Sequence, residues 1–161
     1  HQQFRRVVEQ LDLVARSAEV GLTPYEAVIL ASLIEEEALL DGDRPKISRV
    51  IHNRLAANWR LGIDASSRYA AGKTAGEPMT SEDLAVVSLW NTRVVAGLPP
   101  TPIAAPGRAS MEAALAPVPG SWMYYVRTDE GGVSGAHTFA VTASEFESAR
   151  RVCVEKDLGC G

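Results

Sequence analysis

Three consecutive glutamates, Glu35, Glu36 and Glu37, are the residues of this chain whose types and spacing could do chemistry. They follow an almost wholly apolar run at residues 27–34, so at least one of the carboxyl groups should emerge beside buried surface. A carboxylic acid that keeps its proton near neutral pH can act as a general acid. The alternative is a solvated helix end, because runs of charge usually face water.

Glu35 is the strongest candidate of the three because of its place on the predicted helix. At 3.6 residues per turn it shares one stripe with Ser32 and Leu39, whereas Glu37 falls on the other side. Burial, the neighbouring carboxylates and the negative end of the helix dipole should each raise the pKa of Glu35. We therefore expect Glu35 to be the general acid and Glu37 to be a structural partner, for example of Arg54.

The helix that carries the triplet has clear start and stop signals. Thr23 and Glu26 form a T-x-x-E capping box, and Pro24 suits the first helical position. We expect this helix to run over about residues 24–40, where an Asp-Gly pair stops it. Because it is apolar nearly all round, it should lie in the core.

The rest of the chain predicts a mostly helical α+β fold with a small antiparallel hairpin. Helical spacing and capping residues predict further helices at about residues 2–19, 43–55, 107–115 and 143–156, a single turn at 66–71 and a weaker helix at 81–96. Turn residues flank two β-rich runs, at 122–126 and 137–141.

Residues 97–106 contain four prolines, which predict a stiff, extended segment that we interpret as the wall of a cleft. We expect one catalytic domain over residues 1–161, in which 1–20 lead in and 153–161 form a tail.

The composition is that of an ordinary globular protein: of 161 residues, 46% are hydrophobic and 22% are charged. The net charge of −4 argues against nucleic acid as a partner. No run approaches the roughly 18 apolar residues of a membrane helix, so we expect no membrane contact from this fragment itself. The sequence contains no nucleotide-binding motif, and its histidines and cysteines do not have the spacing of metal ligands. We therefore expect neither a cofactor nor a metal.

The two cysteines, Cys153 and Cys160, lie close together near the end of the chain. A disulfide that closes so short a loop contributes about 2–3 kcal/mol on the chain-entropy model. It would also indicate an oxidising compartment. Two free thiols are the alternative; we predict the disulfide.

Four polar residues are further candidates. Asn91 and Thr92 interrupt an apolar pattern beside the proline-rich segment, and we predict that they line the same cleft as Glu35. Asp64 is either a second carboxylate for catalysis or a turn-capping side chain. His137 is a lone histidine, for which a structural hydrogen bond is the alternative to a functional role.

Several segments, in their order along the chain, resemble the MltG (YceG-like) endolytic murein transglycosylases. Residues 31–38 resemble the family's glutamate signature, and residues 47–55 resemble its I-S-x-V-x-x-N-R-L segment. Asn91-Thr92 and residues 97–103 resemble its N-T and G-L-P-P-x-P-I block. Pro-Gly at 106–107, Tyr-Tyr-Val at 124–126 and His-Thr-Phe at 137–139 complete a match over about residues 20–150.

Two segments depart from the family pattern. The usual L-Q-x-D-P-T run is Leu-Gly-Ile-Asp-Ala-Ser at 61–66, and Y-N-T-Y is Trp-Asn-Thr-Arg at 90–93. The resemblance also implies a membrane helix and a LysM-like subdomain in the parent protein. Neither is present here, so we expect this chain to be a fragment of an anchored protein.

The resemblance implies cleavage of the β-1,4 bond between N-acetylmuramic acid and N-acetylglucosamine in peptidoglycan, without water, to leave a 1,6-anhydro end. Glu35 would be the catalytic residue, acting first as acid and then as base, with Glu37 and Arg54 in support. The groups that would hold the sugar are Asn53, Asp64, Asn91, Thr92 and His137.

By the same resemblance, the protein would act outside the cytoplasm, in the periplasm or on the cell-wall side of the membrane. Penicillin-binding proteins and other wall-synthesis enzymes are the implied protein partners. Two alternatives remain: a muramidase that uses Glu35 with Asp64, and a non-catalytic module that binds glycan strands or serves as a scaffold in a wall-synthesis complex.

Overall fold

The structure is a computed structural model that describes residues 2–160. It confirms the mostly helical α+β class, with one two-stranded antiparallel sheet. The helices and strands are α1 (Gln2–Gln10), α2 (Leu13–Glu19), α3 (Pro24–Glu37), α4 (Arg44–Ala56), α5 (Asp64–Ala70), α6 (Ser81–Leu84), α7 (Arg108–Leu115), β1 (Tyr124–Arg127), β2 (His137–Ala140) and α8 (Ala143–Glu155), with short 3₁₀ turns η1 (Asp41–Asp43) and η2 (Glu130–Gly132).

Helix α3 is the central element of the core. It begins as predicted: Thr23 accepts a hydrogen bond from the Glu26 amide at 3.2 Å, and the Glu26 carboxylate accepts one from the Thr23 amide at 2.8 Å. Most of the apolar side chains between them and the glutamates, such as Leu30 and Leu33, are buried, and Val28 is partly buried. The helix ends at Glu37, slightly earlier than expected, because Ala38 is extended.

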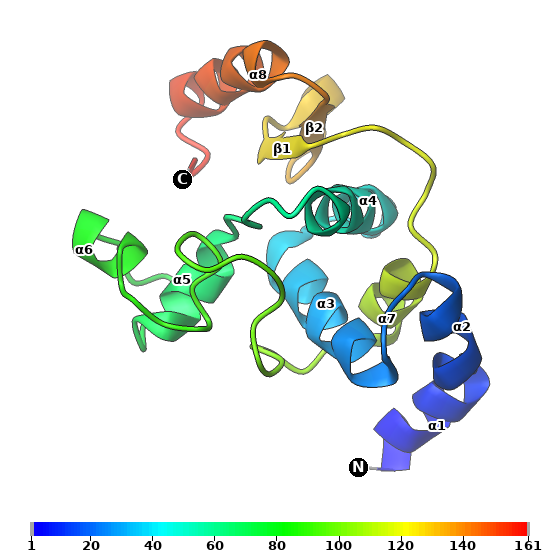
Figure 1. The fold of residues 1–161 in the computed structure, drawn as a ribbon. Coiled ribbons are helices and arrows are strands. Elements are labelled where there is room, and N and C mark those ends of the chain that lie inside the picture. Colours follow the sequence, from blue (N-terminus) through cyan, green and yellow to red (C-terminus); the bar gives the residue numbers. More distant parts are fainter. Residues whose placement is uncertain (1, 161) are drawn as a thin grey trace.

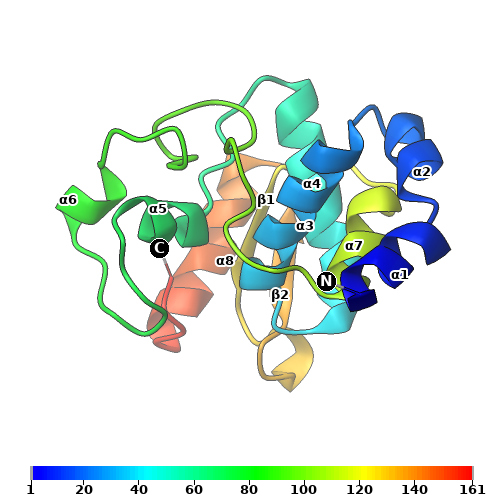
Figure 2. The ribbon, with the colours of Figure 1, turned by 90° about the horizontal axis from the view of Figure 1, so that it is seen from below.

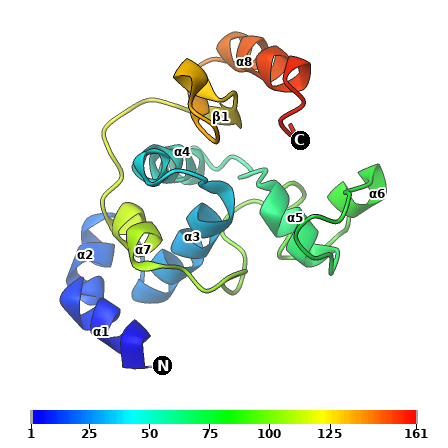
Figure 3. The same ribbon diagram turned by 180° about the vertical axis from the view of Figure 1, so that it is seen from behind.

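Four helices surround α3. It packs against α7, α4, α2 and α5, which together shield it on most sides (Figure 1). Figure 3 shows the same arrangement from behind. The carboxyl end of α3, which carries the glutamates, therefore lies among segments that are distant in the sequence.

The hairpin and α8 form two further layers over α4. Strands β1 and β2 pair antiparallel, with Tyr124 opposite Ala140 and Arg127 opposite His137. Helix α8 packs on the hairpin, and β1 packs on α4 (Figure 1). A disulfide joins Cys153 to Cys160, as predicted, and ties the tail back to α8.

Three local predictions need correction. The helix expected at 2–19 is two helices, because Asp12 adopts a left-handed conformation with φ 48° between α1 and α2. Of the helix expected at 81–96, only α6 forms, and the rest of the region is an irregular loop. The Asn91 side chain stabilises this loop by donating to the carbonyls of Leu84 and Val86, at 3.0 and 2.8 Å. The helix expected from residue 43 begins at Arg44, and the N-cap residue Asp43 makes no capping hydrogen bond with its side chain.

By length and composition, no single helix among residues 2–160 could cross a membrane. The pair α2 and α3 passes that test together, but it is bent by 81°.

Candidate functional site

Three donors from outside α3 hold one oxygen of Glu35. The Ser110 hydroxyl donates to Oε2 at 2.6 Å, the Gly107 amide at 3.1 Å and the Arg44 Nη1 at 3.4 Å. Arg44 also donates to the Ser110 hydroxyl oxygen at 2.5 Å, so the two side chains act together. Within the described residues no hydrogen bond reaches Oε1, and the Glu35 side chain is 31% exposed. Glu35 thus has one fixed oxygen and one free oxygen.

These contacts correct the expected electrostatics of Glu35. The hydrogen bond from Ser110 is the main reason why its pKa lies below the usual value; the Gly107 amide and the Arg44 cation lower it further, while burial opposes them. Gly107 is the N-cap of α7, so the positive end of that helix dipole also faces the carboxylate. The expectation of a raised pKa was wrong, because it counted burial, the neighbouring carboxylates and the negative end of α3 but not the donors that other segments bring to Glu35.

The proline-rich segment brings two of these donors, Gly107 and Ser110, to α3. The amide of Ile103 donates to the Ser32 hydroxyl at 3.1 Å, one helical turn before Gly107 meets Glu35. The chain between α6 and α7 therefore follows the Ser32–Glu35 stripe and passes in front of α3 before entering α7 (Figure 2). This confirms that Ser32 and Glu35 share one face.

Glu37 lies in a different environment, in a cavity of about 190 Å³. Its carboxylate accepts a hydrogen bond from the Tyr125 hydroxyl at 2.9 Å. Burial raises the pKa of Glu37 to about 7, against the opposing effect of that hydrogen bond. Its partner is Tyr125 rather than the expected Arg54: among residues 2–160, no hydrogen bond or ion pair joins Glu37 to Arg54.

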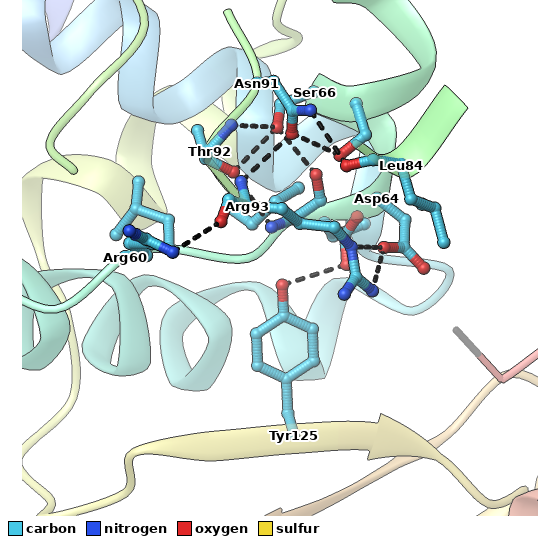
Figure 4. A network of polar contacts seen from close by, with 12 residues as sticks. Arg60, Asp64, Ser66, Leu84, Asn91, Thr92, Arg93 and Tyr125 are labelled. Carbon is cyan, nitrogen blue, oxygen red and sulfur yellow. Dashed lines mark hydrogen bonds and ion pairs between the residues drawn. The ribbon is translucent and has the colours of Figure 1, made fainter. Parts of the chain in front are cut away.

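Asn91 and Thr92 have buried side chains, exposed by 0% and 1%, and both are used inside the protein. The Asn91 side chain accepts from the Ser67 hydroxyl at 2.8 Å in addition to its bonds to α6 and the loop. The Thr92 hydroxyl accepts from the Ile63 amide at 2.9 Å. Figure 4 shows this network. The expected contact of these side chains with a sugar is therefore blocked in this conformation.

The same network fixes Arg93 and Asp64. Arg93 Nε donates to Asp64 Oδ1 at 2.6 Å, and its Nη2 forms an ion pair with the same oxygen (Figure 4). Both residues line the cavity of Glu37. The predicted Asn91-Thr92 pair thus supports the Glu37 side of α3, and none of its hydrogen bonds in the described chain reaches Glu35.

Asn53 and Arg54 hold the chain that leads into β1. Asn53 Nδ2 donates to the carbonyls of Gly120 and Trp122, at 3.1 and 2.9 Å. Arg54 Nε donates to the carbonyl of Met123 at 2.6 Å. Arg54 therefore supports the structure, as expected, and Asn53 does so as well.

His137 is buried, and it makes the structural hydrogen bonds that were the alternative to a functional role. Its amide and Nδ1 lie 2.9 and 3.1 Å from one carboxylate oxygen of Asp43. His137 nevertheless lines the Glu37 cavity.

Sequence reasoning missed Arg44, Gly107 and Ser110 as partners of Glu35. The available signal was the position of Ser110 three residues after Gly107, at the start of a predicted helix. A side chain there can bind an anion at the helix N-terminus.

The comparisons with known proteins place this chain in one family. The model of the YceG-like family matches residues 1–152, and the chain belongs to this family. A YceG-like protein from Listeria monocytogenes, known from a crystal structure at 2.6 Å, has a TM-score of 0.78 and 33% identity, over 88% of this chain and 45% of that one.

Two similar relatives are named endolytic murein transglycosylases. The protein from Bacillus subtilis (strain 168) is 38% identical over 126 residues, which cover 78% of this chain and 34% of the relative. The protein from Streptococcus pneumoniae serotype 2 is 30% identical over 110 residues, which cover 66% of this chain and 20% of the relative. The chain thus spans about a third or less of these relatives.

Proposed function

We propose that this chain is the catalytic part of an endolytic murein transglycosylase. The substrate is the glycan strand of peptidoglycan, and the bond cleaved is the β-1,4 bond between N-acetylmuramic acid and N-acetylglucosamine. Family membership and the names of the relatives support this proposal. The observation that carries it is Glu35, which has one oxygen fixed by three donors and the other free at a partly exposed surface.

A single carboxyl group suffices for this reaction. Protonated Glu35 gives its proton to the glycosidic oxygen, and the bond from that oxygen to C1 of the muramic acid breaks. The C6 hydroxyl of the same sugar then bonds to C1, and its proton returns to the Glu35 carboxylate. No water is consumed, so no second carboxylate is needed to activate one, as it would be in an inverting hydrolase. We assign the proton transfers to Oε1.

The low pKa of Glu35 makes the reaction dependent on acid. In the free protein Glu35 is ionised at neutral pH, and only the small protonated fraction can begin the reaction. That fraction grows as the pH falls toward the pKa, so kcat/KM should rise with falling pH. A glycan that covers Glu35 and removes water would favour the protonated form further.

A muramidase that uses Glu35 with Asp64 is less well supported. Asp64 is paired with Arg93 and lines the cavity of Glu37, which lies on the other side of α3 from Glu35. A hydrolase normally needs two carboxyl groups that flank one bond.

One digest separates the three candidate functions. Purified peptidoglycan is incubated with the chain, and the products are analysed by mass spectrometry. We expect anhydro-muropeptides that contain no added water. Products heavier by one water would indicate a muramidase, and glycan binding without any product would indicate a scaffold module.

We also propose that the protein acts on the cell-wall side of the membrane, outside the cytoplasm. The Cys153–Cys160 disulfide is consistent with an oxidising compartment. Membrane anchoring of the parent protein, and penicillin-binding proteins or other wall-synthesis enzymes as partners, belong to the same proposal.

A further inference from the structure

The cavity beside Glu37 has the size of a small chemical group. Its volume of about 190 Å³ matches roughly six water molecules at their share of liquid volume. Side chains from α3, α4, α5, both strands and α8 line it, together with the tail. It is therefore built by segments that only the complete fold brings together.

The cavity contains more positive than negative fixed charge. Three arginines line it: Arg93 is paired with Asp64, and Arg127 is paired with Asp129. Among the described residues Arg54 has no carboxylate partner, since its hydrogen bonds go to main-chain carbonyls. Burial accordingly lowers the pKa of Arg54. A buried cation without a counter-ion favours the binding of an anion.

Glu37 adds a donor to this cationic wall. With a pKa of about 7, a large fraction of it is protonated at neutral pH, and the protonated carboxyl can donate a hydrogen bond. The charged and titratable groups that face it are Tyr125 from β1, Asp64 from α5 and Arg93 from the loop after α6. Arg54 from α4 and His137 from β2 lie in the same cavity.

We propose, building on the function proposed above, that this cavity binds a carboxylate group of the substrate, carried by the short peptide on the muramic acid. Arg54 supplies the unpaired positive charge, Arg127 adds a guanidinium that also pairs with Asp129, and protonated Glu37 donates a hydrogen bond to the carboxylate. Glu35 and Glu37 lie on opposite sides of a helix about 10–12 Å in diameter. A peptide of a few residues, at about 3.3 Å per residue when extended, spans that distance.

One wall of the cavity lies beyond the family match. Gly159 and Cys160 line it, whereas the match ends at residue 152. The disulfide to Cys153 holds this wall in place. The tail residues therefore complete this side of the proposed carboxylate site.

The first test measures binding by titration calorimetry with three probes. These are N-acetylmuramoyl-L-alanine, its methyl ester, and acetate. We expect the acid to bind about tenfold or more tightly than the ester, because the ester lacks the charge that the arginines recognise. Equal binding of acid and ester would overturn the proposal. If acetate binds as tightly as the acid, the site does not recognise the muramoyl peptide, and the claim that this peptide supplies the carboxylate is refuted.

The second test uses the coupling to a proton on Glu37. With a pKa of about 7, protonated Glu37 falls about tenfold between pH 6 and pH 8, so the acid should bind about tenfold more tightly at pH 6. The Glu37→Gln variant keeps an amide donor at every pH, and it should bind equally at both values. A wild-type affinity that does not change with pH, or a pH dependence that persists in the variant, would contradict the role of Glu37.

A matched pair of arginine variants checks the charge. Arg127→Gln should weaken binding of the acid by about tenfold. Arg151→Gln, on the exposed surface of α8, should leave it unchanged. Equal effects of the two variants would refute the site. The binding measurement does not depend on turnover. If the chain binds the acid but releases no anhydro-muropeptides from peptidoglycan, the proposed function is refuted and the carboxylate site is not.

Discussion

Two carboxyl groups at the end of α3, those of Glu35 and Glu37, differ in almost every property except their residue type. Glu35 meets a hydroxyl, an amide and a guanidinium, which lower its pKa. Glu37 meets a phenol inside a cavity, where burial raises its pKa to about 7. The difference arises from the segments that the rest of the chain packs on each side, because both groups share one helix.

This contrast suggests a division of roles. A partly exposed carboxylate with one free oxygen can exchange protons with a substrate that approaches from solvent. An enclosed carboxyl that keeps its proton is better suited to hold a ligand group. Two positions along a helix, which place side chains on opposite faces, are enough to separate the two roles.

The largest effect should come from Glu35→Gln, which removes the transferable proton from one side of the comparison. Because Glu35 acts as acid and then as base, the rate should fall by more than the roughly 10²–10⁴-fold typical of one proton transfer. Release of anhydro-muropeptides is the measurement. The chain should still fold, because the amide can accept the same hydrogen bonds.

Glu36→Gln is the matched control, since Glu36 is exposed and points away from the Ser32–Glu35 stripe. We expect it to retain most activity. If Glu36→Gln is inactive and Glu35→Gln is active, the wrong member of the triplet has been assigned.

Ser110→Ala should have the next largest effect, by making Glu35 more like Glu37. Loss of the hydroxyl removes the main cause that lowers the pKa of Glu35, so that pKa should rise. The protonated fraction then persists to higher pH, and the falling limb of kcat/KM should move to higher pH. The rate at the optimum should fall by about tenfold at most.

Ser148→Ala, on the exposed face of α8, is the control and should leave the pH profile unchanged. A Ser110→Ala profile that superimposes on that of the wild type would show that Ser110 has only a packing role.

Cys160→Ser should affect the Glu37 side alone. Loss of the disulfide should lower the free energy of unfolding by about 2–3 kcal/mol, as measured by denaturant titration. A loosened tail admits water to the cavity, so the pKa of Glu37 should move toward its ordinary value. The reduced wild type is the control, and its free energy of unfolding should match that of the variant. If the oxidised wild type is no more stable than the variant, the disulfide does not stabilise the fold.

Thr23→Ala should have the smallest effect, because it changes the helix that both groups share. Loss of the N-cap should lower the free energy of unfolding by about 1 kcal/mol. Neither glutamate should titrate differently, since the cap lies at the opposite end of α3. Thr142→Ala, which removes the corresponding cap of α8, is the matched control for stability.

Features with local signals could be predicted from the sequence. These features depend on residues that lie close together in the chain: the capping boxes at Thr23 and Thr142, the hairpin of β1 and β2, and the disulfide. The position of Glu35 on the Ser32 stripe follows from helical periodicity alone.

The environment of Glu35 could not be predicted in this way. Its three donors are 9, 72 and 75 residues away in the sequence, and only tertiary packing brings them to the carboxylate. Asn91 misled for another reason: its side chain donates to carbonyls seven and five residues earlier in the chain, rather than to a ligand.

Titration of the two carboxyl groups by ¹³C NMR tests the central claim most directly. Signals are assigned by comparison with Glu35→Gln and Glu37→Gln. We expect Glu35 to titrate below the usual range for a glutamate and Glu37 to titrate near pH 7. Equal pKa values, or the reverse order, would contradict the claim that one helix end shifts the pKa values of its two carboxyl groups in opposite directions.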